Sequence, residues 1–383
     1  MRFPEFEGEW KKEQLGDTAD FSKGAGISKE QLSEKGEPCI LYGELYTKYK
    51  SEVIYDIISK TDIDSTKLVR SQANDVIIPS SGETAEDIAT ARCVLKNNIL
   101  LGGDLNIIRL HKHSGSFMSY QLNGKRKYDI AKVAQGVSVV HLYAEHLKGV
   151  NTYNPCMEEQ EKIARLLSLL DERIATQNKI IEDLNKLKSA IIEKEYTHKT
   201  KSNSHIGDFI EQTSKRNKNR AIQNVLSVSN RQGFIQQSEQ FENRSVASDD
   251  TSSYKIVKKN NFAFNPARIN VGSIARLTTF DRGIVSPMYI CFRTKDTLFP
   301  EYLDYYFETK QFFTEIQKRL EGSVRQCLSF EGLCNIPLCI PTIEVQQQVG
   351  KQLSTLVQEI KLEIDFLELL QRQKKFLLHQ MFI

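Results

Sequence analysis

Two long stretches of the chain place apolar residues at spacings of three, four or seven positions. Such spacing lines one face of an α-helix with apolar side chains, as the seam of a coiled coil requires. The seam residues are Ile163, Leu167, Leu170, Ile174, Ile181, Leu184 and Ile191 in the first stretch and Val349, Leu353, Leu356, Ile360, Leu367, Leu370 and Leu377 in the second. The pattern predicts one long helix within residues 155–197 and another within residues 341–383. Each stretch opens with a proline, Pro155 or Pro341, which suits the first turn of a helix.

The two helices belong to a sequence repeat with an offset of 186 residues. Residues 134–196 align with residues 320–382 without a gap, and 14 of these 63 positions are identical. A weaker match joins residues 15–17 to residues 206–208 at an offset of 191. Because a repeat of this kind carries the same supersecondary unit twice, we predict a duplicated chain in which a globular domain precedes each long helix.

The narrow apolar face of each helix favours pairing of the two helices with each other. We expect an antiparallel coiled coil with an internal pseudo-two-fold repeat, in which Ile163 approaches Leu377 and Ile191 approaches Val349. The alternative is that each helix packs on its own globular domain. Three polar residues interrupt the seams and are expected to fix the register: Asn178, Lys188 and Lys374.

Residues 1–154 and 198–340 differ in sequence, and both contain short β-rich runs separated by helical patterns. We therefore predict an α+β fold class with two globular domains joined by the two helices. The predicted boundaries are residues 1–154 for the first domain, 155–197 for its helix, 198–340 for the second domain and 341–383 for its helix.

Composition and charge narrow the classes of function. The chain of 383 residues is 26% charged and 40% hydrophobic and contains no run of 18 apolar residues, so a membrane span is not expected. Seven cysteines fit a reducing cytoplasm better than a disulfide framework. The net charge is only +3, but residues 196–338 carry 20 Lys and Arg against 14 Asp and Glu. A locally basic domain is compatible with a polyanionic partner.

Polar loops between the β-rich runs hold the candidate DNA-binding side chains. Arg, Lys, Asn, Gln and Glu contact base edges, and Lys, Ser and Thr bind phosphates. The candidates of the first domain are Tyr42, Glu44, Tyr46, Thr47, Lys48, Lys50, Ser80 and Ser81. The candidates of the second domain are Lys215, Arg216, Lys218, Arg220, Arg268, Arg276 and Arg325. For each of these residues taken singly, a solvated surface loop is the alternative.

Motifs that would indicate catalysis are missing. The chain has no phosphate-binding G-x-x-x-x-G-K-[ST] motif, and Gly24-Ala25-Gly26 lacks the third glycine of a dinucleotide loop. Asn154-Pro155 and Asn265-Pro266 lack the second proline and the aromatic residue of an amino-methyltransferase motif. His111 and His113 have no third ligand for a zinc ion. We predict no catalytic residue and no metal site.

Several motifs resemble the specificity subunits of type I restriction–modification systems. The most specific match is Pro155 followed by Glu158-Glu159-Gln160-Glu161-Lys162-Ile163-Ala164, and its second copy begins at Pro341 and continues with Glu344-Val345-Gln346-Gln347-Gln348-Val349. Further matches are Phe3-Pro4-Glu5-Phe6 through Trp10, Leu15-Gly16-Asp17, Tyr42-Gly43-Glu44, Ile78 to Thr84, and Gln135-Gly136 leading to His141-Leu142. The resemblance extends over essentially the whole chain.

This resemblance implies that each globular domain is a target recognition domain for one half of a bipartite, asymmetric site in double-stranded DNA. The paired helices would fix the spacer and bind two methyltransferase subunits, which would carry S-adenosylmethionine and methylate adenine. Restriction subunits, with ATP and Mg, would complete the complex. The family places no cofactor and no catalytic residue in this chain. Two alternatives remain open at this point: a coiled-coil interaction scaffold without DNA binding, and a stand-alone DNA-modifying enzyme.

Overall fold

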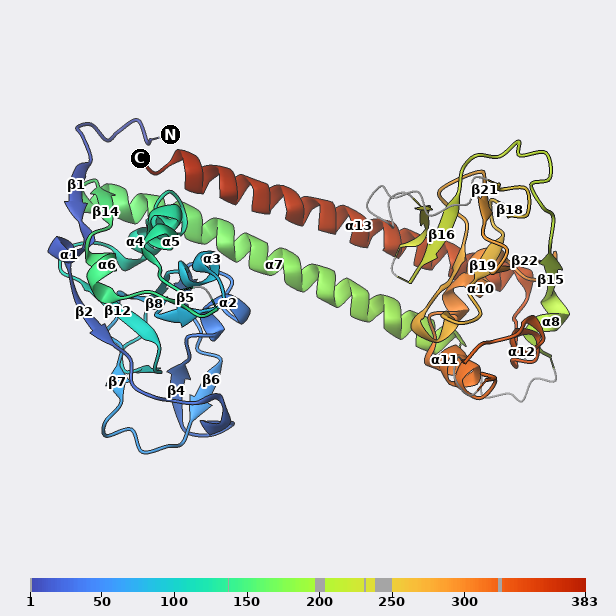
Figure 1. Ribbon diagram of the computed structural model, residues 1–383, viewed down its shortest axis with the longest axis horizontal. Coiled ribbons are helices and arrows are strands. Elements are labelled where there is room, and N and C mark those ends of the chain that lie inside the picture. Colours follow the sequence, from blue (N-terminus) through green and yellow to red (C-terminus); the bar gives the residue numbers. More distant parts are fainter. Residues whose placement is uncertain (1, 137, 197–203, 231, 238–249, 323–325) are drawn as a thin grey trace. The chain divides into compact units, whose positions relative to one another are not determined.

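The computed structural model describes residues 2–136, 138–196, 204–230, 232–237, 250–322 and 326–383 (Figure 1). The chain folds into two compact units. Unit 1 comprises Met1–Ile180 and Glu363–Ile383, and unit 2 comprises Ile181–Leu362. The unit boundaries fall inside two long helices, α7 (Met157–Tyr196) and α13 (Ile343–Gln380), so each helix contributes residues to both units. The prediction of a mixed helix-and-sheet fold with two long helices is confirmed.

Unit 1 is built around two five-stranded sheets. The first has the order β2 (Ala19–Lys23), β12 (Leu105–Leu110), β8 (Asp75–Pro79), β10 (Arg92–Val94) and β5 (Val53–Ile54). The second has the order β3 (Leu32–Ser33), β6 (Ser59–Thr61), β4 (Glu37–Ile40), β11 (Leu100–Leu101) and β7 (Val69–Arg70). Two further antiparallel pairs join β1 (Lys11–Gln14) to β14 (Asn151–Asn154) and β9 (Ser81–Gly82) to β13 (Val140–His141).

The short helices of unit 1 are α1 (Leu15–Thr18), α2 (Glu44–Thr47), α3 (Ala85–Ile88), α4 (Gly115–Asn123), α5 (Lys127–Val133) and α6 (Ala144–Lys148), with a 3₁₀ turn at Lys29–Gln31. Strand β8 is buried along its whole length, and its side chains alternate between two cores because successive residues of a strand point to opposite faces. Val76 and Ile78 belong to one core, and Ile77 belongs to the other.

Unit 2 has a four-stranded sheet in the order β15 (Ile210–Thr213), β22 (Ile290–Thr294), β19 (Phe262–Phe264) and β20 (Ile274–Arg276). Two antiparallel ribbons accompany it: β16 (Leu226–Ser229) with β17 (Gly233–Gln236), and β18 (Lys255–Lys258) with β21 (Arg282–Val285). Its short helices are α8 (Ile206–Phe209), α10 (Pro300–Tyr306), α11 (Lys310–Gln317) and α12 (Phe330–Cys334), with a 3₁₀ turn at Ile269–Val271.

The sequence repeat corresponds to a repeat of structure in the two units. Helix α12 lies 186 residues after α6, and the α8–β15 segment follows α1–β2 by 191 residues. In unit 1 the amide of Leu15 donates to the carbonyl of Val150 at 2.9 Å, and in unit 2 the amide of Ile206 donates to the carbonyl of Ile336 at 2.9 Å. The two offsets therefore belong to one repeated unit. The five-residue difference between them lies in the segment of chain that separates the first helix and strand from the later elements.

A repeated glutamine fixes the start of each long helix. Gln160 is buried in unit 1, donates to the carbonyl of Pro155 at 2.9 Å and accepts the amide of Ser114 at 3.0 Å. Gln346 is buried in unit 2 and donates to the carbonyl of Pro341 at 2.9 Å, while its side-chain oxygen accepts the amide of Phe299 at 2.8 Å. In each unit the side chain of the glutamine thus connects the long helix to the N-cap residue of a short helix, which is Ser114 for α4 and Phe299 for α10.

Within unit 1, the first half of α7 contacts the last part of α13 in the antiparallel sense. Gln177 donates to the carbonyl of Glu363 at 3.1 Å, whereas Ile163, at the other end of this segment, shares a core with Leu377. Within unit 2, Ile191 packs against the core that contains Val349. The predicted approaches of Ile163 to Leu377 and of Ile191 to Val349 agree with these shared cores.

All fourteen predicted seam residues are buried or half-buried. The polar residues of the seam differ from the prediction in one place. Asn178 is exposed and donates to the carbonyl of Ile174 on its own helix, whereas its neighbour Gln177 is buried. The prediction for Asn178 was wrong because the helix face turns by about 100° from one residue to the next, so that only one of two adjacent polar residues can face the seam.

Candidate nucleic-acid interface

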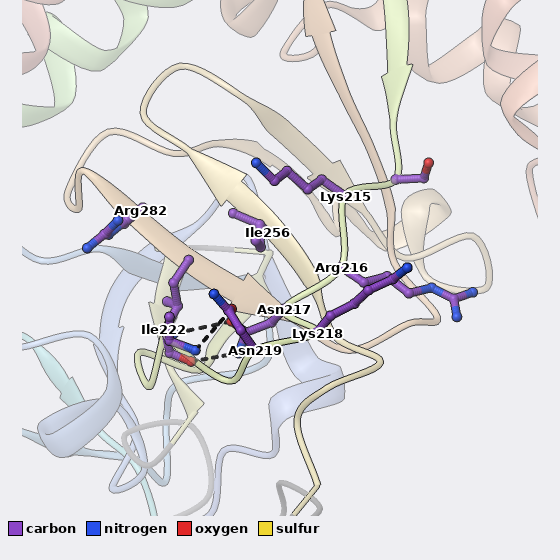
Figure 2. A pocket seen from close by; sticks show the side chains of 10 residues that line it. Lys215, Arg216, Asn217, Lys218, Asn219, Ile222, Ile256 and Arg282 are labelled. Atoms are coloured by element: carbon purple, nitrogen blue, oxygen red, sulfur yellow. Dashed lines mark hydrogen bonds between the residues drawn. The ribbon is translucent and has the colours of Figure 1, made fainter.

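A basic groove lies in unit 2, on the loop that follows β15. Its volume is about 760 Å³, and no acidic residue lines it. The lining residues are Ser214, Lys215, Arg216, Asn217, Lys218, Asn219, Ala221, Ile222, Ile256 and Arg282. Figure 2 shows Arg216 and Lys218 extending to the same side of the loop, while Arg282 projects from the neighbouring strand β21. The groove therefore presents cations and amides from two segments that are distant in the sequence.

Asn217 is fully buried and holds the loop in place from within. Its side-chain amide donates to the carbonyl of Ile222 at 2.9 Å, and its side-chain oxygen accepts the amide of Ile222 at 3.2 Å. Its backbone amide donates to Tyr254 at 2.9 Å, and its backbone carbonyl accepts the amide of Arg220 at 2.8 Å. One residue thus closes the turn from residue 217 to residue 222 and fastens it to the segment that leads into β18.

The cations of this loop are exposed. Lys215, Arg216 and Lys218 form no ion pair within the part of the chain that the structure describes. Arg220 adopts a left-handed backbone conformation, with φ of 54°, and pairs with Asp250 at 3.1 Å. The hydrogen bond from the amide of Ser252 lowers the pKa of Asp250, and Arg220 adds to this effect. Three positive charges are therefore available to an anionic ligand.

The other predicted residues of the second domain have different surroundings. Arg268 is exposed, after the strand β19. Arg276 is largely buried, and its guanidinium contacts Asp304 at 3.0 Å, Glu301 at 3.3 Å and Asn260 at 2.9 Å. These internal partners give Arg276 a structural role. Arg325 lies outside the described residues.

In unit 1 the predicted loop at residues 42–50 is organised around a buried carboxylate. Glu44 accepts the amide of Leu41 at 2.9 Å and pairs with Lys48 at 2.6 Å, and the hydroxyl of Ser59 donates to it as well. Because these donors occupy its oxygens, Glu44 holds helix α2 in place and has little capacity left for a base edge. Thr47 and Lys50 are exposed, and their side chains donate to the backbone carbonyls of Gly43 and Tyr46.

Tyr42 and Tyr46 of this loop are half-buried, and a third tyrosine, Tyr49, is buried. Tyr42 packs against the core of unit 1 that contains Leu45 and Ile77. Burial raises the pKa of Tyr46. Tyr42 and Tyr46 each carry a hydroxyl group that can donate or accept a hydrogen bond.

Ser80 and Ser81 lie where two loops of unit 1 meet. Ser80 is buried, its backbone amide donates to the carbonyl of Asp104 at 2.7 Å, and its carbonyl accepts the amide of Leu142 at 2.9 Å. Ser81 is half-buried and lies opposite His141 in the β9–β13 pair. Among the predicted DNA-binding residues of the first domain, Thr47, Lys48 and Lys50 are exposed.

Sequence reasoning omitted seven of the ten residues that line the basic groove, among them Asn217, Asn219 and Arg282. Asn217 and Asn219 alternate with the selected cations along the loop, and the short spacing of amides and cations in residues 215–220 was the available signal. Arg282 enters the groove only because β21 pairs with β18, with Arg282 opposite Lys258. That pairing joins residues far apart in the chain, so a local pattern does not predict it.

Neither a metal cluster nor a membrane-spanning helix is found in the described residues. No group of three or more His, Cys, Asp or Glu side chains there is placed to hold a metal ion. No helix in this part of the chain combines the length and the hydropathy that crossing a membrane requires. The Gly24-Ala25-Gly26 segment packs on the sheet instead, since the amides of Gly24 and Ala25 donate to the carbonyls of Leu105 and Leu101.

Comparison with known proteins places residues 7–186 in one family. These residues match the model of the type I restriction modification DNA specificity domain. The type I restriction enzyme MjaVIII specificity subunit of Methanocaldococcus jannaschii is 27% identical over 220 residues, which are 55% of this chain and 48% of that protein. The putative type I restriction enzyme MjaX specificity subunit of the same organism is 32% identical over 122 residues, 30% of this chain and 29% of that protein. The chain thus matches less than half of the length of each of these relatives.

The fold is similar to solved structures over nearly the whole chain. The type I restriction–modification S subunit from M. genitalium aligns with a TM-score of 0.62 at 16% identity and covers 100% of this chain and 99% of that one. A chain from a structure described as the basis of complex assembly and conformational transition of the type I R-M system aligns with a TM-score of 0.56 at 13% identity, over 98% and 97% of the two chains. Residues 7–186 are thus similar to the type I restriction modification DNA specificity domain, and the fold of nearly the whole chain is similar to that of a type I restriction–modification S subunit.

Proposed function

We propose that this chain is the non-catalytic DNA-recognition subunit of a type I restriction–modification complex and that its two units bind the two halves of a bipartite, asymmetric site. One observation carries the proposal: the two units share a frame but bear different additions. The shared frame includes α1–β2 and α8–β15, α6 and α12, and the glutamine contacts at Gln160 and Gln346. Unit 1 adds a second five-stranded sheet, whereas unit 2 adds two ribbons and the basic groove.

This division suits an asymmetric site. Different half-sites need different surfaces for direct contact with base edges, while the parts that set separation and bind a common partner can stay alike. Linking two weak DNA-binding surfaces also raises the overall affinity through effective concentration. We therefore assign recognition to the bodies within residues 1–154 and 198–340 and assign separation to the helices within residues 155–197 and 341–383, paired antiparallel about a pseudo-two-fold axis.

The long helices also carry apolar side chains that face away from the buried seam. Leu362, Leu369 and Phe376 of α13 are exposed and spaced by seven residues, and Ile180 and Leu187 of α7 are exposed with the same spacing. A heptad stripe left in solvent on a helix is suited to packing against further helices. It supports docking of two methyltransferase subunits on the helices, which would bring S-adenosylmethionine, and of restriction subunits, which would bring ATP and Mg.

The test is to express the chain together with its type I methyltransferase subunit in a host that lacks adenine methylation and to sequence the modified bases of the genome. We expect methylated adenines on both strands of one bipartite motif with a fixed unread spacer. Cells with the methyltransferase subunit alone are the control and should show none.

Exchange of residues 198–340 for those of a relative with a different site should change one half of the motif and leave the other half and the spacer intact. Methylation that stays the same after this exchange, or that the chain produces without a methyltransferase subunit, would exclude the proposed role.

A further inference from the structure

We propose that Asn217 is a positioning residue that pre-forms the basic groove of unit 2 for the phosphodiester backbone of duplex DNA. This inference rests on the proposed function and adds to it the place of backbone contact in unit 2 and the residue that prepares it. Asn217 itself does not touch the DNA, because it is fully buried.

The chemistry of the groove fits phosphate oxygens. Four cations lie along it, Lys215, Arg216, Lys218 and Arg282, and no carboxylate lines it. All four side chains are exposed. Lys and Arg side chains are the main phosphate ligands of DNA-binding proteins, and contacts of this kind fix the register of a protein on the duplex. The exposed amide of Asn219, between these cations, is also within the groove.

The first part of the loop that carries the cations is tied to β18, where the amide of Ile256 donates to the carbonyl of Lys215 at 2.7 Å, and its turn at residues 217–222 depends on Asn217. Residues 214–222 contain no strand or helix, and yet both polar ends of the Asn217 side chain are engaged by Ile222 across the turn. The backbone of Asn217 holds Arg220 in its left-handed conformation through a further hydrogen bond. A loop fixed in advance loses less conformational freedom when a ligand binds, and affinity rises accordingly.

The same position in unit 1 is built differently, which supports a role specific to one half-site. After β2 the chain continues through Gly24 and Ala25, whose amides are tied to the carbonyls of Leu105 and Leu101. A Cβ atom on Gly24 would lie 1.9 Å from the carbonyl oxygen of Gly102. Both loops are tied to segments of their own unit, since in unit 2 the amide of Ile256 donates to the carbonyl of Lys215 at 2.7 Å, but the loop after β15 is basic and borders the groove. The two loops follow equivalent strands of the repeat, and the one in unit 2 carries the cations of the groove.

The experiment compares Asn217→Ala with Lys218→Ala in the complex with the methyltransferase subunits. Binding to a DNA duplex with the methylated motif is measured at several salt concentrations. Lys218→Ala should weaken binding and reduce the slope of log affinity against log salt by about 1, because one phosphate contact is lost. Asn217→Ala should weaken binding by about tenfold, or about 1.4 kcal/mol, with the wild-type slope, because every cation is still present.

Hydrogen exchange on the DNA-free complex gives a second readout. The amide of Ile222, which donates to the side-chain oxygen of Asn217, should exchange faster in Asn217→Ala and at the wild-type rate in Lys218→Ala. Asn217→Ser, whose side chain is too short to span the turn, should behave like the alanine variant and serves if the latter does not fold.

Three outcomes separate the inference from the proposed function. If the wild-type complex shows no specific DNA binding, the proposed function fails. If the wild-type complex binds but Asn217→Ala binds equally well despite faster exchange, the positioning role is wrong and the proposed function stands. If Asn217→Ala lowers the salt slope as Lys218→Ala does, or if Lys218→Ala changes neither affinity nor slope, the groove does not bind phosphates in the way proposed.

Discussion

Replacing Lys374 by methionine should destabilise unit 1 strongly. The ammonium group of Lys374, on α13, contacts two carboxylates at once: Glu52, which precedes β5, and Asp171, on α7. Asp171 also accepts the hydroxyl groups of Ser51 at 2.8 Å and Tyr120 at 2.7 Å. The Lys374, Glu52 and Asp171 side chains are only 13%, 9% and 6% exposed, so solvent screens these charges little. This cluster joins both long helices to the body of unit 1.

The size of this destabilisation follows from the charges that remain buried after the substitution. A methionine fills a similar volume, but the two carboxylates then lose their direct ion-pair partner, and the buried guanidinium of Arg92 is the cation left to act on both. Breaking a buried ion pair from one side costs about 3–5 kcal/mol, because the remaining charge is uncompensated. Such a loss is a large part of the 5–15 kcal/mol that typically stabilises a folded domain.

The loss of stability in Lys374→Met should depend on pH. Burial raises the pKa of Glu52 above its usual value, with Asp171 adding to the rise and Lys374 opposing it. A carboxyl group whose pKa is raised by folding binds its proton more tightly in the folded state, so its contribution to stability is present at low pH and is lost as the pH rises through the folded-state pKa. In Lys374→Met the opposing ammonium group is gone. The difference from the wild type should therefore be larger at pH 8 than at pH 5.5.

The assay uses the only tryptophan of the chain, Trp10, which is buried in unit 1 beside Phe117 and Phe382. Its fluorescence during urea unfolding reports on unit 1. The matched control is Lys188→Met, at the repeat position in unit 2, where the lysine pairs with the half-exposed Glu308. An ion pair of that kind contributes about 0–1 kcal/mol, and circular dichroism should show little change. Equal losses in the two variants, or no change of the Trp10 transition in Lys374→Met, would refute the reasoning.

Two further predictions concern the repeated frame. Gly136→Ala should lower stability by about 1–3 kcal/mol, because Gly136 has φ of 123° and a Cβ atom would lie 2.0 Å from the carbonyl oxygen of Val139. Gly149→Ala, whose Cβ would meet nothing closer than 3.6 Å, is its control in thermal unfolding and should melt like the wild type. Gln346→Ala should lower the free energy of unfolding in urea by about 1–3 kcal/mol. The carbonyl groups of Thr297 and Pro341 and the amide of Phe299 then lose their buried hydrogen-bond partner. An unchanged midpoint of unfolding would mean that water replaces the glutamine.

The parts of the fold that follow a sequence period could be predicted from the sequence. The spacing of apolar residues gave both long helices, and every seam residue from Ile163 to Leu377 is at least half-buried. The repeat at an offset of 186 residues also predicts local backbone features that the spacing of apolar residues does not indicate. Gly136 and Gly322 both have positive φ, and each follows a residue in a short antiparallel bridge, Gln135 with His141 and Glu321 with Cys327. Such agreement arises because duplicated segments keep the backbone conformations that their contacts require.

The candidate site could be predicted only in part, because a residue type does not reveal its surroundings. Glu44 and Arg276 were selected as polar groups of the kind that contact bases, but internal partners occupy both in the structure. Asn217 was passed over, although it organises the loop that carries the selected Lys215, Arg216 and Lys218. Whether a polar side chain faces inward depends on pairings between distant segments, such as β18 with β21, which the local sequence does not contain.

The division between repeated and unrepeated contacts indicates which surfaces of the two units can change without loss of the fold. The contacts that recur at the same offset, such as Gln160 with Pro155 and Gln346 with Pro341, hold each long helix to its unit and involve no exposed cation. The contacts that do not recur, such as those of Asn217, shape exposed polar loops. Substitution in such a loop alters a surface while leaving the buried contacts of the helices unchanged. Under the proposed function, such a chain would change one half of its DNA site independently of the other half and of the spacer between them.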